Sequence, residues 1–328
     1  MKVKVGIIGY GKIGKLRHKI LNNINCVDVV SIYDPLKKKS NKNIYSNSAQ
    51  DILKNSSIDT VFIATPNYLN HKYTLQALIN NKNVFCEKPP ATSENQLKEI
   101  IKIEKKTKKK LMYGFNHRHH NSIKKMRNII QSNKLGNILW MRGRYGKSVD
   151  NNFLNNWRSK KKYSGGGILM DQGIHMLDLL NYFSGGFDII KSIVSKSYWN
   201  LSIEDNVFAI FKNKKNNISA SLHSTITQWR HLFSLEIFLE NGYLVLNGLK
   251  TSSNSYGTEE LSVAINRTPL PRAISLKEKK YIYKTDNSFF IETKIFIKSI
   301  INNHKIQTCN SNEALQIMKI LSKIYKDG

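Results

Sequence analysis

The fold is decided by residues 3–14, VKVGIIGYGKIG. The β-branched run 3–8 predicts a short buried strand, and the apolar spacing over 12–22 predicts a helix. The glycines between them follow the pattern G-x-G-x-x-G, and this strand–turn–helix context favours a dinucleotide site over a generic glycine turn. The first glycine permits the tight turn, the second lets the backbone approach a pyrophosphate at the helix N-terminus, and the third lets the helix pack on the strand. The expected cofactor-binding residues of this turn are Gly9, Gly11, Lys12, Ile13 and Gly14.

Strands and helices continue to alternate over residues 1–118, which predicts a first domain with a doubly wound parallel sheet of the Rossmann type. Further strands are expected at 27–33, 60–64, 83–87 and 111–115, and helices at 49–54, around 73–78 and from 93 to about 107. At the last of these helices, Ser93 is expected to cap the N-terminus, with Gln96 as its capping-box partner.

The rhythm changes after Asn116, and residues 119–328 are predicted to form a second, α+β domain. Successive strands without long crossovers predict a large, mostly antiparallel open sheet. Asn241-Gly242 is expected to form a hairpin turn within it. Two helices close the chain, near 289–301 and 313–325, and the C-terminal helix can pack back on the first domain. Residues 247–285 contain no motif that we can interpret.

Asp34 supports the dinucleotide interpretation independently, because it ends the second strand 20 residues after Gly14. A carboxylate there accepts hydrogen bonds from the adenosine ribose and repels a 2′-phosphate, which favours NAD over NADP. The neighbouring lysines 37–39 leave NADP open, since one of them could fold back onto a phosphate.

Two polar segments end further parallel strands, at the sheet edge where ligands bind in open α/β sheets. The first contains Thr65, Pro66 and Asn67, with His71 four residues on; Thr65 or Asn67 could instead cap a helix. The second contains Glu87 and Lys88 before a proline. A lysine there would place a cation beside a nicotinamide, and the alternative is a surface lysine before a turn. We count all six residues as candidate cofactor contacts.

A glycine triplet at 165–167 precedes Asp171, His175 and Asp178 on one predicted helical face. An Asp and a His in contact range can act as an oriented acid/base pair. A surface ion pair and a metal site are the alternatives. The metal site is disfavoured because no further His or Cys stands at ligand spacing nearby.

The composition disfavours three classes of protein: nucleic-acid-binding, disulfide-rich and membrane-spanning. The formal net charge is +29, but the lysines are scattered and carry no interleaved aromatic residues, so a solvated surface is favoured over a nucleic-acid partner. Three cysteines at unrelated spacings predict neither a disulfide framework nor a metal site. No stretch approaches the length of a membrane span. The chain enters a strand at once, with no signal-peptide pattern, so we expect a cytoplasmic protein without a membrane partner.

In order, these motifs resemble the glucose–fructose oxidoreductase, inositol dehydrogenase and rhizopine-catabolism family, Gfo/Idh/MocA. The matching pieces are GYGKIG, IYDP, ATPNYLNH, CEKPPAT, YGFNHR and WRSKKKYSGGGILMDQGIHMLD, which span residues 1 to about 185. The resemblance implies a catalytic trio of Lys88, Asp171 and His175 between the two domains. In it, His175 is the general base, Lys88 stabilises the oxyanion and Asp171 orients its neighbours. It also places Asn116, Arg118, Trp157 and Arg158 near the substrate, and it implies a homodimer or homotetramer formed through the C-terminal sheet.

The expected function is therefore hydride transfer between NAD and a secondary alcohol of a sugar, a nucleotide-linked sugar or a cyclitol. Among these we favour a nucleotide-linked sugar used in polysaccharide assembly, because a basic protein could attract a diphosphate. Two alternatives stay open at this point: a non-enzymatic, NAD-sensing regulator of the same fold, and an NAD-dependent glycosidase.

Overall fold

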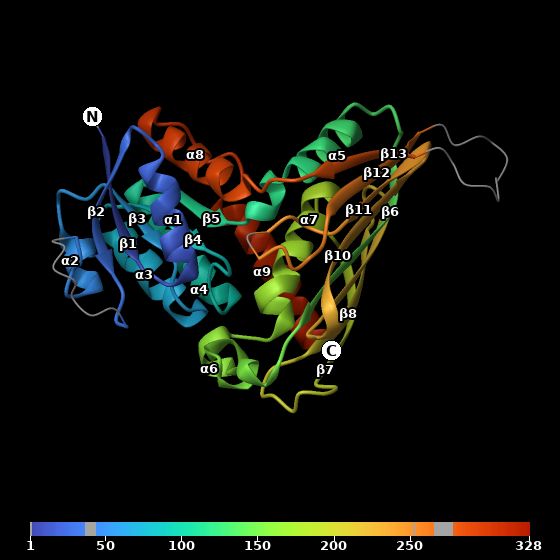
Figure 1. Ribbon diagram of the computed structural model, residues 1–328, viewed down its shortest axis with the longest axis horizontal. Coiled ribbons are helices and arrows are strands. Elements are labelled where there is room, and N and C mark those ends of the chain that lie inside the picture. Colours follow the sequence, from blue (N-terminus) through green and yellow to red (C-terminus); the bar gives the residue numbers. More distant parts are fainter. Residues whose placement is uncertain (1, 37–43, 252, 266–277) are drawn as a thin grey trace. The chain divides into compact units, whose positions relative to one another are not determined.

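The computed structural model describes residues 2–36, 44–251, 253–265 and 278–328 (Figure 1). The chain forms two compact units, which we describe separately. The first unit comprises Met1–Asn116, Lys162–Gly165 and Phe289–Met318. The second comprises His117–Lys161, Gly166–Ser288 and Lys319–Gly328. The chain therefore returns to the first unit twice after leaving it at Asn116. The sequence analysis divided the chain only once, into residues 1–118 and 119–328, and did not include these returns.

The first unit is built on a five-stranded sheet with the order β2-β1-β3-β4-β5, in which every pair is parallel. This confirms the predicted Rossmann-type sheet. Its strands are β1 (Val3–Ile8), β2 (Val27–Tyr33), β3 (Thr60–Ile63), β4 (Asn83–Glu87) and β5 (Leu111–Gly114). Its helices are α1 (Lys12–Asn22), α2 (Ala49–Lys54), α3 (Asn67–Ile79), α4 (Glu94–Thr107) and α8 (Ser288–Ile301), and α9 (Ser311–Asp327) is divided between the units.

Helices cover both faces of this sheet, as the almost wholly apolar strands require. On one face, Phe62 and Phe85 stack with ring centroids 5.0 Å apart, and both meet Phe296 of α8. On the other face, Gly6 of β1 leaves room for Ile52 of α2, which a Cβ at that position would strike. The parallel strands are thus buried from two sides, and polar groups of the unit concentrate at the strand ends.

The connection order creates a switch point at the carboxyl edge of the sheet. β1 lies between β2 and β3, so the chain leaves β1 to one side and later pairs on its other side. Ligands of open α/β sheets bind in the crevice outside such a point. The loops that follow β1, β3 and β4 all begin at this edge.

The N-terminus of α4 differs in one detail from the expected capping box. The Ser93 hydroxyl accepts from the backbone N–H of Gln96, as predicted. The Gln96 amide oxygen, however, accepts from the backbone N–H and hydroxyl of Thr92, so the reciprocal bond to Ser93 is replaced by one to the preceding residue.

The second unit is built on an eight-stranded sheet with the order β13-β12-β11-β10-β6-β9-β8-β7. All pairs are antiparallel except β6 with β9, which agrees with the predicted mostly antiparallel sheet. Its strands are β6 (Ile138–Ser148), β7 (Ile189–Ser195), β8 (Asn206–Asn213), β9 (Ile218–Thr225), β10 (Thr227–Leu239), β11 (Gly242–Asn247), β12 (Glu259–Ile265) and β13 (Lys279–Tyr283). The last two strands lie in the segment for which the sequence offered no motif.

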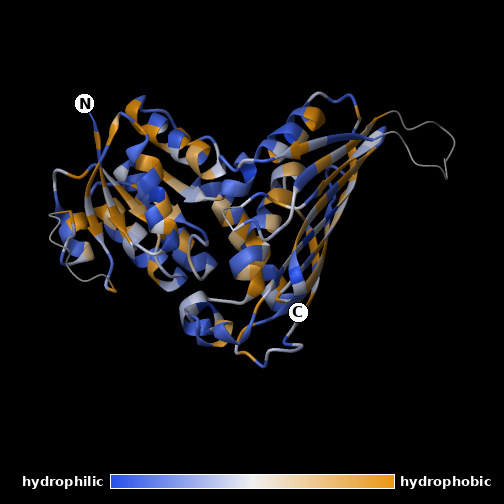
Figure 2. Cartoon of the chain, in the orientation of Figure 1, coloured by the Kyte–Doolittle hydropathy of each residue, from blue (hydrophilic) through white to orange (hydrophobic). Residues whose placement is uncertain are grey.

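Among the described residues, helices of the unit cover one face of this sheet and none of them covers the other. The helices of the unit are α5 (Asn121–Gln131), α6 (Lys161–Ser164, shared with the first unit) and α7 (Ile174–Ser184), with the short turns η1 (Asn116–His119), η2 (Asn151–Asn155), η3 (Trp157–Ser159) and η4 (Leu169–Gly173). α7 packs closely on β6, because a Cβ at Gly143 would lie 2.5 Å from Cγ of Met176. Buried and more exposed residues alternate along β8 and β11. Figure 2 shows hydrophobic and hydrophilic residues mixed along the strands of this sheet. The uncovered face carries exposed Ile193, Phe208 and Ile210.

The hairpin between β10 and β11 turns one residue earlier than predicted. Leu239 pairs with Gly242, so the two turn residues are Glu240 and Asn241. The prediction of Asn241-Gly242 as the turn was wrong because Gly242 belongs to the strand. A Cβ there would collide with the backbone oxygen of Ala264 on β12, so close strand approach requires this glycine. Among the described residues, no helix is long and apolar enough to cross a membrane.

Candidate active site

The glycine turn has the geometry that a dinucleotide pyrophosphate needs. Gly9 has a φ of +90°, which favours glycine. A Cβ on Gly14 would collide with the backbone oxygen of Gly9, so α1 can start this close to β1 only with glycine. Gly11 is the N-cap of α1; no described side chain caps the helix there, and a Cβ at Gly11 would meet no described atom within 4 Å. Free N–H groups beside open space at a helix N-terminus suit a phosphate, so the residues present fit the cofactor.

Asp34 is held against this turn. Its carboxylate accepts from the backbone N–H of Tyr10 at 2.6 Å and from that of Leu36 at 2.9 Å. These bonds fix the carboxylate beside the start of α1, where a ribose would follow the pyrophosphate. The lysines 37–39 that left the choice of cofactor open lie outside the described residues.

The segment after β3 does not cap α3 in the way the alternative interpretation required. Pro66 is the N-cap residue, and it makes no side-chain capping hydrogen bond. The Thr65 hydroxyl donates instead to Oδ1 of Asn70 at 2.9 Å, and the Asn67 amide donates to the carbonyl of Ser164 at 2.8 Å. The side chain of His71 pairs with Glu99 of α4, with 2.8 Å between Nε2 of His71 and Oε2 of Glu99. A Cβ on Gly9 would lie 2.5 Å from the carbonyl of Ala64, so the glycine turn and this segment touch.

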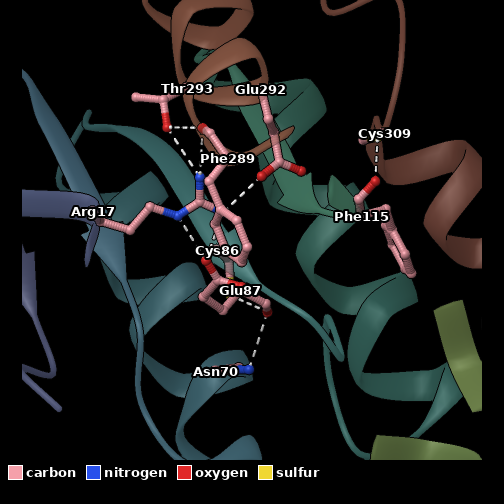
Figure 3. Close-up of polar contacts among 9 residues, drawn as sticks. All are labelled: Arg17, Asn70, Cys86, Glu87, Phe115, Phe289, Glu292, Thr293 and Cys309. Atoms are coloured by element: carbon pink, nitrogen blue, oxygen red, sulfur yellow. Dashed lines mark hydrogen bonds and ion pairs between the residues drawn. The ribbon is translucent and has the colours of Figure 1, made fainter. Parts of the chain in front are cut away.

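Glu87 ends β4 and Lys88 follows it. A buried polar cluster begins at the Glu87 side chain (Figure 3). Arg17 of α1 donates from Nε to Oε1 of Glu87 at 2.8 Å and from Nη2 to Oε2 of Glu292 at 2.6 Å. The Arg17 and Glu292 side chains are 1% and 0% exposed. Burial alone would lower the pKa of Arg17, but the two carboxylates raise it, so the guanidinium stays charged. Glu87 therefore faces inward to the cluster, and Lys88 is partly exposed.

In the second unit, the predicted catalytic helix has two parts: the π-helical turn η4, which contains Asp171, and α7, which contains His175. Glu204 holds its start, because its carboxylate accepts from the backbone N–H of Gly167 at 2.7 Å and of Leu169 at 3.1 Å. The hydroxyl of Tyr325 on α9 donates to the same carboxylate at 2.7 Å. A Cβ on Gly167 would collide with the backbone of Glu204, which explains the glycine at this position.

His175 is buried rather than part of a surface ion pair. It is 4% exposed, and its ring stacks on that of His117 with centroids 3.9 Å apart and an interplanar angle of 10°. Nε2 of His117 lies 3.0 Å from the hydroxyl of Tyr145. Burial raises the pKa of Tyr145 well above its ordinary value, so this phenol keeps its proton and can donate it to the imidazole. The plane of the His175 ring is thus set by a second, hydrogen-bonded ring.

The two carboxylates near His175 have different partners. Asp171 is 18% exposed and lies 3.6 Å from Nε of Arg158, whose guanidinium lies over the ring of Trp157 at 4.4 Å. Asp178 is buried and accepts from Nε and Nη2 of Arg118 at 2.8 and 2.6 Å. Arg118 is therefore committed to a buried ion pair, whereas Arg158 and Trp157 are partly exposed beside Asp171. Asn116, the last residue of the first unit's opening segment, is 5% exposed.

The sequence analysis missed several residues of these networks, among them Arg17, Asn70, His117 and Glu204. Arg17 follows Gly14 by three residues, and its place on the inner side of α1 among apolar neighbours was the available signal. Asn70 follows Asn67 by three residues, on the same side of α3. His117 and Glu204 carry no spacing signal, because their partners are distant in sequence.

The comparisons with known proteins agree with the fold of the two units. Residues 3–115 match the model of an oxidoreductase family with an NAD-binding Rossmann fold, and residues 123–245 match the GFO/IDH/MocA C-terminal domain. The glucose-6-phosphate 3-dehydrogenase of Bacillus subtilis is 28% identical over 62% of this chain and 60% of its own. The D-glucoside 3-dehydrogenase of Escherichia coli is 28% identical over 68% of this chain and 66% of its own. The chain thus spans less than two thirds of either relative. A solved levoglucosan dehydrogenase in complex with NADH is similar in fold, with a TM-score of 0.87 at 20% identity, covering 100% of this chain and 97% of that one.

Proposed function

Because the chain belongs to the GFO/IDH/MocA family of oxidoreductases and its first unit is an NAD-binding Rossmann domain, we propose that it is an NAD-dependent sugar dehydrogenase. The observation that carries this proposal is the common sheet edge of the glycine turn and Lys88. The turn follows β1 and Lys88 follows β4, and both strands are parallel members of one sheet. A dinucleotide whose pyrophosphate lies at the turn can direct its other end along this edge toward Lys88.

In the proposed reaction, His175 accepts the proton of a secondary hydroxyl. An imidazole has an ordinary pKa near 6.5, which suits a base at neutral pH. The ammonium of Lys88 stabilises the negative charge that develops on the oxygen. Asp171 orients the imidazole and the substrate, with Arg158 beside it. NAD, when bound, supplies the acceptor for the hydride that leaves the carbon.

For the substrate, we propose a pyranose or pyranoside oxidised at a ring hydroxyl, and the names of the two relatives suggest position 3. The narrower proposals are a nucleotide-linked sugar, a role in polysaccharide assembly and a cytoplasmic location. A panel of hexoses, hexose phosphates, glucosides, inositols and UDP-, GDP- and dTDP-sugars, followed by NADH absorbance, separates the candidate substrates. Turnover of free polyols alone would rule out the nucleotide-sugar proposal.

The test of the catalytic roles is a pair of variants with matched controls. His175→Ala and Lys88→Ala are each expected to lower kcat by roughly 10²–10⁴-fold, the usual contribution of a positioned acid or base. The Kd for NADH should stay largely unchanged. His304→Ala and Lys98→Ala, at exposed sites on the first unit, should keep full activity. Wild-type turnover in either test variant would disprove the role assigned to that residue.

We also propose that a second copy of the chain covers the free face of the eight-stranded sheet. Ile193, Phe208 and Ile210 are 68%, 47% and 61% exposed on adjacent strands, so they form an apolar patch in contact with water. Ile210→Asp should shift the molar mass in solution to that of a monomer. Ile301→Asp, at an exposed site of α8, should not. A monomeric wild-type protein would refute this part of the proposal.

A further inference from the structure

We infer that Asn70 and Arg17 are positioning residues that fix Lys88 by clamping the residues on either side of it. The inference rests on the proposed role of Lys88. Neither residue needs to touch substrate. Each acts through the backbone or side chain next to Lys88, and each comes from a helix that starts at the cofactor edge of the sheet.

Asn70 holds the backbone on both sides of Lys88. It is fully buried, and its Nδ2 donates to the carbonyl of Glu87 at 3.2 Å and to that of Pro89 at 2.8 Å. Its Oδ1 accepts from the Thr65 hydroxyl, which fixes the orientation of the amide. One side chain thus joins the segment after β3 to the carbonyls of the two residues on either side of Lys88, Glu87 and Pro89 (Figure 3 shows the bond to Glu87).

Arg17 holds the side chain of Glu87, the residue before Lys88. Besides Glu87 and Glu292, it donates to Oγ1 of Thr293 at 3.0 Å and to the carbonyl of Phe289 at 3.3 Å. Its guanidinium lies 4.3 Å from the ring centroid of Phe85, so it is packed as well as hydrogen-bonded.

The Glu87 carboxylate has little freedom to leave this arrangement. A buried guanidinium without its carboxylate would be strongly unfavourable, which opposes any outward rotation of Glu87. Gly114, its pairing partner on β5, provides the space: a Cβ there would lie 2.7 Å from Oε2 of Glu87.

Two independent anchors therefore hold residues 87–89: Asn70 holds the backbone carbonyls of Glu87 and Pro89, and Arg17 holds the side chain of Glu87. Reaction rates depend steeply on such placement, since a displacement of about 1 Å in a catalytic group can lower turnover roughly 10²-fold. A binding role would show in the Kd for NADH; a positioning role should show in kcat.

The test compares Asn70→Ala with Asn213→Ala. Asn213 is also a buried asparagine whose Nδ2 donates to two backbone carbonyls, those of Ser184 and Gly186, but it lies in the second unit. Both variants should lower the melting temperature by similar amounts. Only Asn70→Ala should lower kcat, by roughly 10–10²-fold, and increase the isotope effect of a substrate deuterated at the reacting carbon, with the Kd for NADH little changed.

A readout independent of turnover separates this inference from the proposed function. The rate of reductive methylation of Lys88, measured by peptide mass spectrometry against Lys98 as an internal reference, should change in Asn70→Ala and not in Asn213→Ala. If the wild type transfers no hydride but the Lys88 labelling rate still changes, the clamp stands and the proposed function fails.

Arg17→Lys is the second variant, in case Asn70→Ala does not fold. It keeps the charge but loses the forked contact with two carboxylates. It should therefore lower kcat, and it should change the labelling rate of Lys88 in the same direction as Asn70→Ala does. Unchanged kcat and unchanged Lys88 labelling in a folded Asn70→Ala or Arg17→Lys variant would overturn the inference.

Discussion

The sharpest test of the cofactor site is Gly11→Ala, because the fold should tolerate this change and the dinucleotide should not. Gly11 has φ −73° and ψ −158°, an extended conformation with a negative φ, so its backbone does not require glycine. A Cβ there meets no described atom within 4 Å. The substitution therefore adds a methyl group to the space in which a pyrophosphate would approach the backbone.

The expected magnitudes differ strongly between folding and binding. Alanine is a weaker N-cap than glycine, which lowers the stability of the folded state. It also reduces the conformational entropy of the unfolded chain, which raises the stability by about 0.4–1 kcal/mol, so the two effects oppose each other. The melting temperature should change by no more than about 4 °C. A displaced phosphate loses at least one charge-assisted hydrogen bond, worth about 1.5–3 kcal/mol. The Kd for NADH should consequently rise about 10- to 150-fold.

NADH fluorescence titration and thermal melting measure the two quantities on the same sample. Gly14→Ala is the contrasting variant, because its Cβ collides with the backbone oxygen of Gly9 and should lower the melting temperature directly. A Gly11→Ala protein that binds NADH as tightly as the wild type would refute the placement of the pyrophosphate at this turn.

Three further predictions concern selectivity, reactivity and pH dependence. Asp34→Asn keeps an acceptor for the Tyr10 N–H but removes the charge, so kcat/KM for NADP relative to NAD should rise roughly tenfold, equivalent to about 1.4 kcal/mol; an unchanged ratio would contradict the selectivity argument. Burial raises the pKa of Cys86 to about 12, so its thiol should not react with Ellman's reagent at neutral pH until the protein unfolds, whereas the half-buried Cys26 should react. Burial also raises the pKa of Glu204, so the folded state binds its proton more tightly than the unfolded state does. The stability contributed by this group should fall as pH rises from the ordinary glutamate value toward the raised pKa, and Glu204→Gln should lose this dependence in thermal melts.

The strands and helices of the first unit could be predicted because their signals are local. The expected bounds of Val3–Ile8, Lys12–Asn22 and Asn83–Glu87 agree with the structure to the residue. β13 escaped prediction for a physical reason. β13 is an edge strand with two lysines at its start, as edge strands often carry to discourage further pairing, and a lysine-rich segment resembles a loop in sequence.

In the candidate site too, features formed by neighbouring residues could be predicted, and contacts between distant residues could not. The glycine turn is contiguous, so its chemistry is visible in six residues. The Arg17–Glu292 pair joins residues 275 positions apart, and no local pattern encodes that contact. Asn70 and His71 are adjacent polar residues on one helix, and only the packing of α3 shows that Asn70 is the buried one, while His71 bonds to an exposed glutamate.

The first unit is completed by a segment that its sequence motifs do not include. The Rossmann family model matches residues 3–115, but α8 supplies Glu292 and Thr293 to Arg17 and places Phe296 against Phe62 and Phe85. Without α8, a guanidinium that is 1% exposed would lose one of its two carboxylates, and removing one partner of a buried ion pair costs about 3–5 kcal/mol. A penalty of that size is a large fraction of the stability of an ordinary domain. Since the same guanidinium holds Glu87, the stability of the dinucleotide fold and the placement of Lys88 depend on one contact from the far end of the chain.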